Sequence, residues 1–101
     1  MRLRIHYTPL LLEDVLAEGK TEQEYRMANA MGRQSIMNSI RAERTLLLSE
    51  SDWTQFNDSP LTAEKKSEWA TYRQKLRDVT NLVDFSKSFI IDDTFFPTKP
   101  D

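Results

Sequence analysis

The sequence predicts a mainly α fold, in which an antiparallel helical hairpin follows a short N-terminal strand and helix arm and precedes an irregular aromatic C-terminal tail. Apolar residues recur at spacings of three and four in residues 21–48 and again in 63–78, which is the period of an amphipathic helix. The connecting residues 49–61 are rich in Ser, Asp, Asn and Pro, which favour turns. A chain of 101 residues suits a single core. We therefore expect one domain in three parts: an arm (1–20), a hairpin core (21–78) and a tail (79–101).

The arm contains a strand pattern followed by a helix pattern. Residues 2–7 alternate polar and apolar side chains, with a period of two that favours a short half-buried strand. Thr8 is a suitable N-cap, Pro9 suits the first helical position, and Gly19 suits the left-handed residue that closes a helix. We expect a short helix over residues 9–18.

The first long helix begins with the sequence TEQE at residues 21–24, in which Thr21 and Glu24 can form a capping box. From there to about Leu48 the chain has no proline and one glycine, Gly32, which costs about 1 kcal/mol relative to alanine and marks a soft point. The apolar seam predicted for this helix is rich in methionine and comprises Tyr25, Met27, Ala28, Met31, Ile36, Met37, Ile40 and Leu47.

Pro60 and Thr62 are start signals for the second long helix, which is predicted to end at Asp78. It places Trp69, Tyr72, Arg73 and Leu76 on one face, at spacings of three and four. This stripe is expected to pack on the first helix and so form the hairpin.

The tail is too apolar for a disordered segment, although Pro97 and Pro100 stop any regular element near its end. Its apolar residues are Phe85, Phe89, Ile90, Ile91, Phe95 and Phe96. Such a segment is expected to pack on another apolar surface. Two alternatives are left open: the tail packs on the hairpin itself, or it packs on a partner chain.

The chain lacks the usual signatures of an enzyme or a cofactor site. His6 is its one histidine, it has no cysteine, and its two glycines cannot build a phosphate-binding loop. The pairs Glu13-Asp14 and Asp92-Asp93 are interpreted as solvated charge, because no ligand loop surrounds them. We expect no catalytic residue, no cofactor and no metal.

Nucleic-acid and membrane binding are also disfavoured by composition. The net charge of −2 provides no broad positive field for nucleic acid. A small helical DNA-binding protein is the weaker alternative, since Arg33, Arg41 and Arg44 lie on one helix, but residues 49–61 are too long for a helix-turn-helix connection. No apolar run approaches the ~20 residues of a membrane span or forms a secretory signal, so we expect neither a membrane partner nor export.

The loop has a structural interpretation and a functional one. In the first, Ser51 or Asp52 caps a short turn, Trp53 is a buried plug, and the arginines at 73 and 77 hold the loop through Asp52 or Asp58. In the second, Trp53 and Trp69 form an exposed aromatic anchor for a partner protein.

Residues 41–100 contain several motifs in a fixed order: an arginine and a leucine pair, then Ser-Asp-Trp-Thr-Gln, an Asp, Pro-Leu, Trp-Ala-x-Tyr-Arg-x-x-Leu-Arg-Asp and an aromatic-Pro-Thr-x-Pro ending. The residues are Arg44, Leu47, Leu48, Ser51 to Gln55, Asp58, Pro60, Leu61, Trp69, Ala70, Tyr72, Arg73, Leu76, Arg77, Asp78 and Phe96 to Pro100. In this combination they resemble the phage tail assembly chaperone family. Phe96 stands where tryptophan is usual, the segment between Asp78 and Phe96 is longer than is common, and the first 20 residues have no counterpart.

The resemblance implies a non-enzymatic accessory factor that binds a phage tail or tail-fibre protein in the host cytoplasm. The alternative is a structural adaptor that is retained in the virion tail, and self-association is left open. The residues expected to bind the partner or to carry the motif are Trp53, Thr54, Gln55, Trp69, Tyr72, Arg73, Arg77, Phe89, Phe95 and Phe96.

Overall fold

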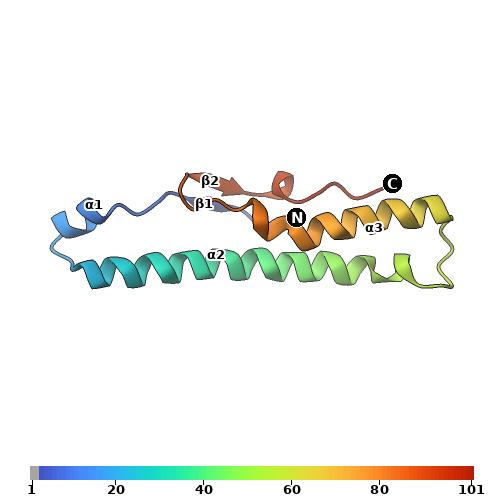
Figure 1. Ribbon diagram of the computed structural model, residues 1–101, viewed down its shortest axis with the longest axis horizontal. Helices are drawn as coiled ribbons and strands as arrows, with labels where there is room; N and C mark the ends of the chain where they lie inside the picture. The colour runs from blue at the N-terminus through green and yellow to red at the C-terminus, as the bar shows by residue number, and fades with distance from the viewer. Residues whose placement is uncertain (1–2) are drawn as a thin grey trace.

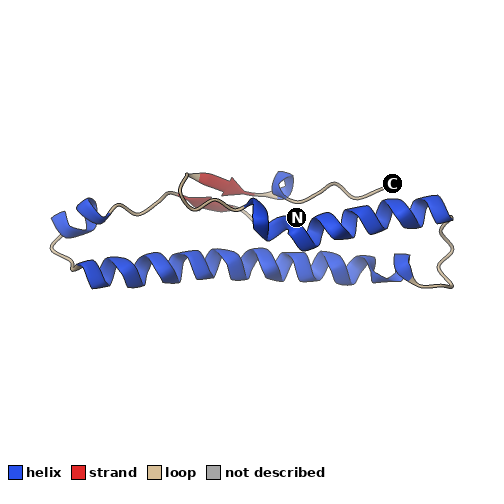
Figure 2. Ribbon diagram, viewed as in Figure 1, coloured by secondary structure: helices blue, strands red, loops and turns tan. Residues whose placement is uncertain are grey.

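The computed structural model describes residues 3–101 and consists of two long helices with the chain's two end segments laid along them (Figure 1). The helices and strands in chain order are β1 (Ile5–Tyr7), α1 (Leu12–Ala17), α2 (Glu22–Ser51), α3 (Ala63–Asp78) and β2 (Phe89–Ile91). The molecule is elongated, with extents of 61 × 21 × 18 Å. Helix dominates and the two short strands lie together (Figure 2), which confirms the predicted fold class. Residue 2, part of the predicted strand, lies outside the described residues.

The start of α2 is the predicted capping box. The Glu24 backbone N–H donates to Thr21 Oγ1 at 3.1 Å, and the Thr21 N–H donates to Glu24 Oε1 at 3.3 Å. The helix continues through Gly32 and ends at Ser51, a few residues beyond the predicted end. Thr62 caps α3 in the same manner, since its Oγ1 accepts from the Lys65 N–H at 3.1 Å.

The apolar seam of α2 is shorter than predicted. Ile40 is fully buried, and Ile36, Met37 and Leu47 pack against the core. In the first half of the helix the prediction was wrong for Met27, Ala28 and Met31, which are exposed. The reason is that α2 extends well beyond α3, so the short helix α1 and the arm cover only one side of that half (Figure 1).

The short helix of the arm starts later than predicted, but Gly19 closes it as predicted. The helix α1 begins at Leu12 rather than Pro9, and its N-cap position is Leu11, which makes no side-chain capping bond. Residues 8–11 are not helical, since the backbone of Leu11 is extended and the Leu10 carbonyl accepts from the Tyr25 hydroxyl at 3.4 Å. Gly19 follows α1 with φ of +85°, as expected for a glycine that ends a helix.

The tail packs on the hairpin, which resolves the alternative left open by the sequence. Its strand β2 pairs antiparallel with β1, and Ile5 lies opposite Ile91. Ile91 and Phe96 enter the core. The buried core cluster consists of Ile40, Tyr72, Leu76, Val79, Ile91 and Phe96. The tail therefore supplies part of the core as well as surface.

Candidate functional site

The loop between α2 and α3 has a defined conformation. It begins with a 3-10 turn over Asp52–Gln55, in which the fully buried Thr54 donates its hydroxyl to the Ser51 carbonyl at 2.6 Å. The Gln55 side-chain amide donates to the Lys66 carbonyl on α3 at 3.2 Å. Thr54 and Gln55 thus hold the loop against both helices.

Arg73 is the main link between the loop and α3. Its Nη1 donates to the Leu48 carbonyl at 2.7 Å and to Ser51 Oγ at 2.8 Å, and its Nη2 reaches Asp52 Oδ1 at 2.8 Å. The Arg73 side chain is largely buried, whereas Asp52 is half exposed. This confirms the predicted contact between Arg73 and the loop, and it adds the last turn of α2 to the set of groups that Arg73 holds.

The companion prediction for Arg77 was wrong. The Arg77 guanidinium donates to Gln74 Oε1 at 3.3 Å within α3, and the Arg77 carbonyl accepts from Arg44 at 3.2 Å. Arg77 lies one turn further from the loop than Arg73 does, on an exposed face. Asp58, its other expected partner, has no ion pair within residues 3–101.

Aromatic rings lead from the loop into the core. The centroids of Trp53 and Trp69 are 6.3 Å apart, and Trp69 meets Tyr72 edge to face at 5.5 Å. Tyr72 is buried, but Trp53 is 44% exposed, so the interpretation of Trp53 as a buried plug was wrong. Phe56 in the same loop is 56% exposed. We call Trp53 and Phe56 the loop aromatics.

Phe56 was not among the residues selected from the sequence. A usable signal was present, because Phe56 is a large apolar residue among the polar, turn-favouring residues 49–61. Such a side chain has few apolar neighbours in its own loop, and exposure is the common outcome.

The tail aromatics lie away from the loop. Phe89 in β2 stacks on Tyr7 with a centroid distance of 4.7 Å, and β2 lies over the middle of α2, whereas the loop is at the end of the hairpin (Figure 1). Phe95 and Phe96 meet edge to face at 5.3 Å. Phe96 is only 6% exposed, so its ring serves the core and is not available as a contact surface.

Tyr72 has a perturbed acidity. Burial of its hydroxyl raises the pKa of Tyr72 above its usual value, and the negative charges of Glu50 and Glu43 raise it further. The folded chain therefore keeps this proton at a pH where the unfolded chain has released it.

A pH dependence follows from the raised pKa of Tyr72. The free energy of unfolding should fall as the pH rises above about 10, because only the unfolded state then ionises this tyrosine readily. The Tyr72→Phe variant should lose that part of the fall. Subtracting the absorbance titration of Tyr72→Phe from that of the parent gives the Tyr72 midpoint, and a midpoint at or below 10 would contradict this assignment.

Two features that other functions need are absent from residues 3–101. No group of three or more His, Asp or Glu side chains is arranged to hold a metal ion. None of the helices in that range has the length and apolar character needed to span a membrane.

Comparison with known protein families identifies the chain. The model of the phage tail assembly chaperone protein family matches residues 37–101, which cover the loop, α3, the tail and the second half of α2. The chain belongs to the phage tail assembly chaperone family. Membership indicates an accessory role in tail assembly and confirms the resemblance noted in the sequence. No curated protein and no solved structure matches the chain.

The family match includes every residue of the candidate site. Residues 1–36, which contain β1, α1 and the exposed first half of α2, lie outside it. The loop aromatics and the side chains that position them lie within the matched region.

Proposed function

We propose that this tail assembly chaperone binds a tail or tail-fibre protein in the host cytoplasm, without catalysis, and covers an apolar surface of that protein until assembly. The observation that carries the proposal is the exposure of both loop aromatics within the region that matches the family. Large aromatic side chains dominate the energetics of many protein interfaces.

The positioning of the loop supports a binding role. Arg73, Thr54 and Gln55 fix the loop backbone by hydrogen bonds, while Trp53 and Phe56 remain accessible. A rigid loop loses little conformational freedom when it binds, so more of the contact energy appears as affinity. The surroundings are polar and include Asp52 and Asp58, which suits an interface that must later separate.

The expected effect of removing the loop aromatics is a loss of binding without a loss of fold. Trp53→Ala combined with Phe56→Ala should weaken binding to the tail or tail-fibre protein by at least about 30-fold, the range of a hot-spot side chain. Isothermal titration calorimetry measures the affinity, and the melting temperature should change little because both rings are about half exposed.

Leu82→Ala provides a matched control for this prediction. Leu82 is at least as exposed as the loop aromatics, but it lies beyond the far end of α3 from the loop. Its removal should leave the affinity unchanged. Equal affinity of the double variant and the parent would show that the partner binds elsewhere.

Retention in the virion as a structural adaptor is the second candidate. It is favoured by the sheet, because β1 and β2 pair only with each other within the described residues and each has an outer edge to which a neighbour could add a strand. Quantitative mass spectrometry of purified virions distinguishes the two functions. A fixed ratio to the tail-fibre protein supports the adaptor, whereas absence from particles together with co-purification of that protein from lysate supports the chaperone.

A further inference from the structure

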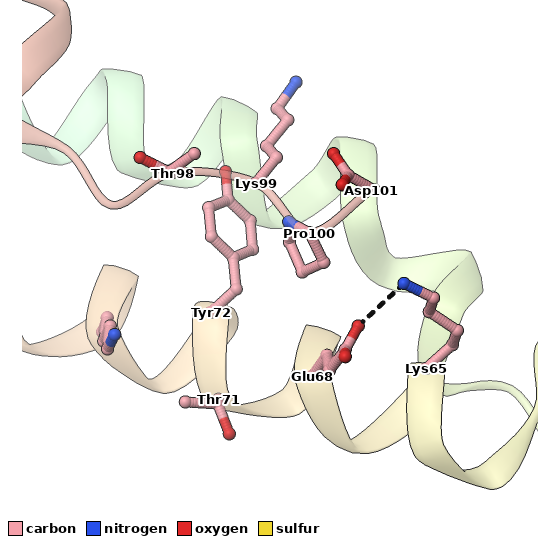
Figure 3. A pocket seen from close by; sticks show the side chains of 9 residues that line it. Lys65, Glu68, Thr71, Tyr72, Thr98, Lys99, Pro100 and Asp101 are labelled. Atoms are coloured by element: carbon pink, nitrogen blue, oxygen red, sulfur yellow. Dashed lines mark ion pairs between the residues drawn. The ribbon is translucent and has the colours of Figure 1, made fainter.

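The last residues of the chain cross the ring of Tyr72, and a cavity opens on each side of the crossing. Figure 3 shows the cavity on the α3 side, where Tyr72 points toward the crossing segment and Lys65 pairs with Glu68. The second cavity lies between α2 and residues 93–99 and has a volume of about 500 Å³. We call this second cavity the Tyr72 groove. Its lining residues are Glu43, Leu46, Leu47, Glu50, Tyr72, Asp93, Phe96, Pro97 and Lys99.

The base of the Tyr72 groove is apolar. The buried rings of Tyr72 and Phe96 lie there beside the half-buried Leu47. Leu46, on the edge of the groove, is 52% exposed. A large apolar side chain that entered the groove would cover Leu46 and the exposed part of Leu47 and remove them from water.

The walls of the two cavities differ in charge. On the α3 side, Lys65 pairs with Glu68 at 3.1 Å, and the lining also includes two further lysines, Lys75 and Lys99, with Asp101 as its second acidic residue, so that cavity is not acidic. In the Tyr72 groove, Glu43 and Glu50 stand two helical turns apart on α2, and no cation of residues 3–101 pairs with Glu43. Both carboxylates act on the base of the groove, since both contribute to the perturbed acidity of Tyr72. Asp93 also lines the groove and has an interaction of its own within the chain.

The chain already places one cation at the groove. The Lys99 ammonium lies 3.7 Å from Glu50 Oε2, and both side chains are about half exposed. An exposed pair at this distance is weak and can be exchanged for another cation. The position of Lys99 therefore indicates that the groove accepts a cation. Lys99 competes only weakly with a cation from a partner.

We propose that the Tyr72 groove binds a segment of a partner protein that presents an arginine or lysine next to a large apolar side chain. The apolar side chain lies on Leu46 and Leu47, and the cation pairs with Glu50 in place of Lys99, with the charge of Glu43 nearby. An arginine fits this role best, because its planar guanidinium can donate two hydrogen bonds to one carboxylate and its stem is apolar. The groove is separate from the loop aromatics, and this inference does not depend on the function proposed for them.

Two blocked synthetic pentapeptides test the proposal: Ac-Gly-Leu-Arg-Leu-Gly-NH2 and the same peptide with glutamate in place of arginine. Each is titrated into the full chain, labelled with nitrogen-15, and followed by NMR. The arginine peptide should shift the amides of residues 43–50 and 93–99, and added salt should weaken its binding. The glutamate peptide should leave those amides unmoved.

Substitutions around the groove should act in opposite directions. Glu43→Gln with Glu50→Gln should weaken the arginine peptide about three- to tenfold, the range expected for two exposed ion pairs. Lys99→Ala should strengthen it about two- to fivefold, because the competing ammonium is gone. Glu68→Gln, in the neighbouring cavity, is the matched control and should change nothing. Equal shifts with both peptides, shifts confined to other residues, no shifts at all, or weaker binding by Lys99→Ala would each overturn the proposal.

Discussion

The Phe96→Ala variant is expected to melt about 12–20 °C below the parent chain. Phe96 is 6% exposed and packs with Tyr72, Leu76 and Ile91, so truncation removes a buried ring and leaves a cavity. Such substitutions cost about 3–5 kcal/mol. At about 4 °C per kcal/mol for a domain of this size, this predicts the stated shift in a thermal melt followed by circular dichroism.

Ile90→Ala is the matched control for Phe96→Ala. Ile90 belongs to the same tail and to the same strand, β2, as Ile91, but its side chain points away from the core and is about half exposed. Its truncation should cost less than about 1 kcal/mol. If both variants melted like the parent chain, the tail would not be part of the core and its aromatic residues would again be candidates for partner contact.

The features that the sequence predicted well are those with local causes. The capping box needs only Thr21 and Glu24, the N-cap of α3 needs only Thr62, and Gly19 needs only its own freedom to adopt a positive φ. Each forms among residues that are close in the chain. Periodicity then indicated which face of α3 is buried, because Tyr72 and Leu76 lie one turn apart on the same side.

The failures have non-local causes. Met27 and Met31 continue the helical period of α2, but periodicity does not tell how far along the helix the covering elements extend. The three residues of β2 form a strand only because β1, more than 80 residues away in the chain, pairs with them. A segment of that length has too little pattern for prediction, and its structure depends on its partner.

At the candidate site, one prediction from the sequence was confirmed and one was wrong. The pairing of Arg73 with Asp52 followed from charge and helical geometry, whereas the exposure of Trp53 did not follow from its apolar character. Tryptophan is amphipathic and is stable when it is partly covered by another ring, here that of Trp69. Sequence reasoning that assigns every tryptophan to the core is therefore least reliable in loops, where partner contacts are common.

The Arg73→Ala variant is expected to lose about 2–4 kcal/mol of stability, since hydrogen bonds to charged groups contribute about 1.5–3 kcal/mol each and some are replaced by water. Arg73 holds the Leu48 carbonyl and Ser51 at the end of α2, and also Asp52 in the loop. Without it the last turn of α2 loses its link to α3. Urea denaturation measures the loss, and faster hydrogen exchange of the amides of residues 51–56 would locate it.

Arg77→Ala is the matched control for Arg73→Ala. It removes a positive charge from α3 without removing a hydrogen bond to the loop or to the end of α2. Arg77 is the same residue type one helical turn away. Its guanidinium is exposed and donates a hydrogen bond to Gln74 within α3, so its removal should cost less than about 0.5 kcal/mol. A double-mutant cycle between Arg73→Ala and Asp52→Asn should give a coupling of at most about 1 kcal/mol, because Asp52 is half exposed. The remainder of the Arg73 effect then belongs to the Leu48 carbonyl and Ser51. Equal costs for Arg73→Ala and Arg77→Ala would mean that the loop is held by Thr54 and Gln55 alone, and the loop aromatics would then be mobile in the free chain.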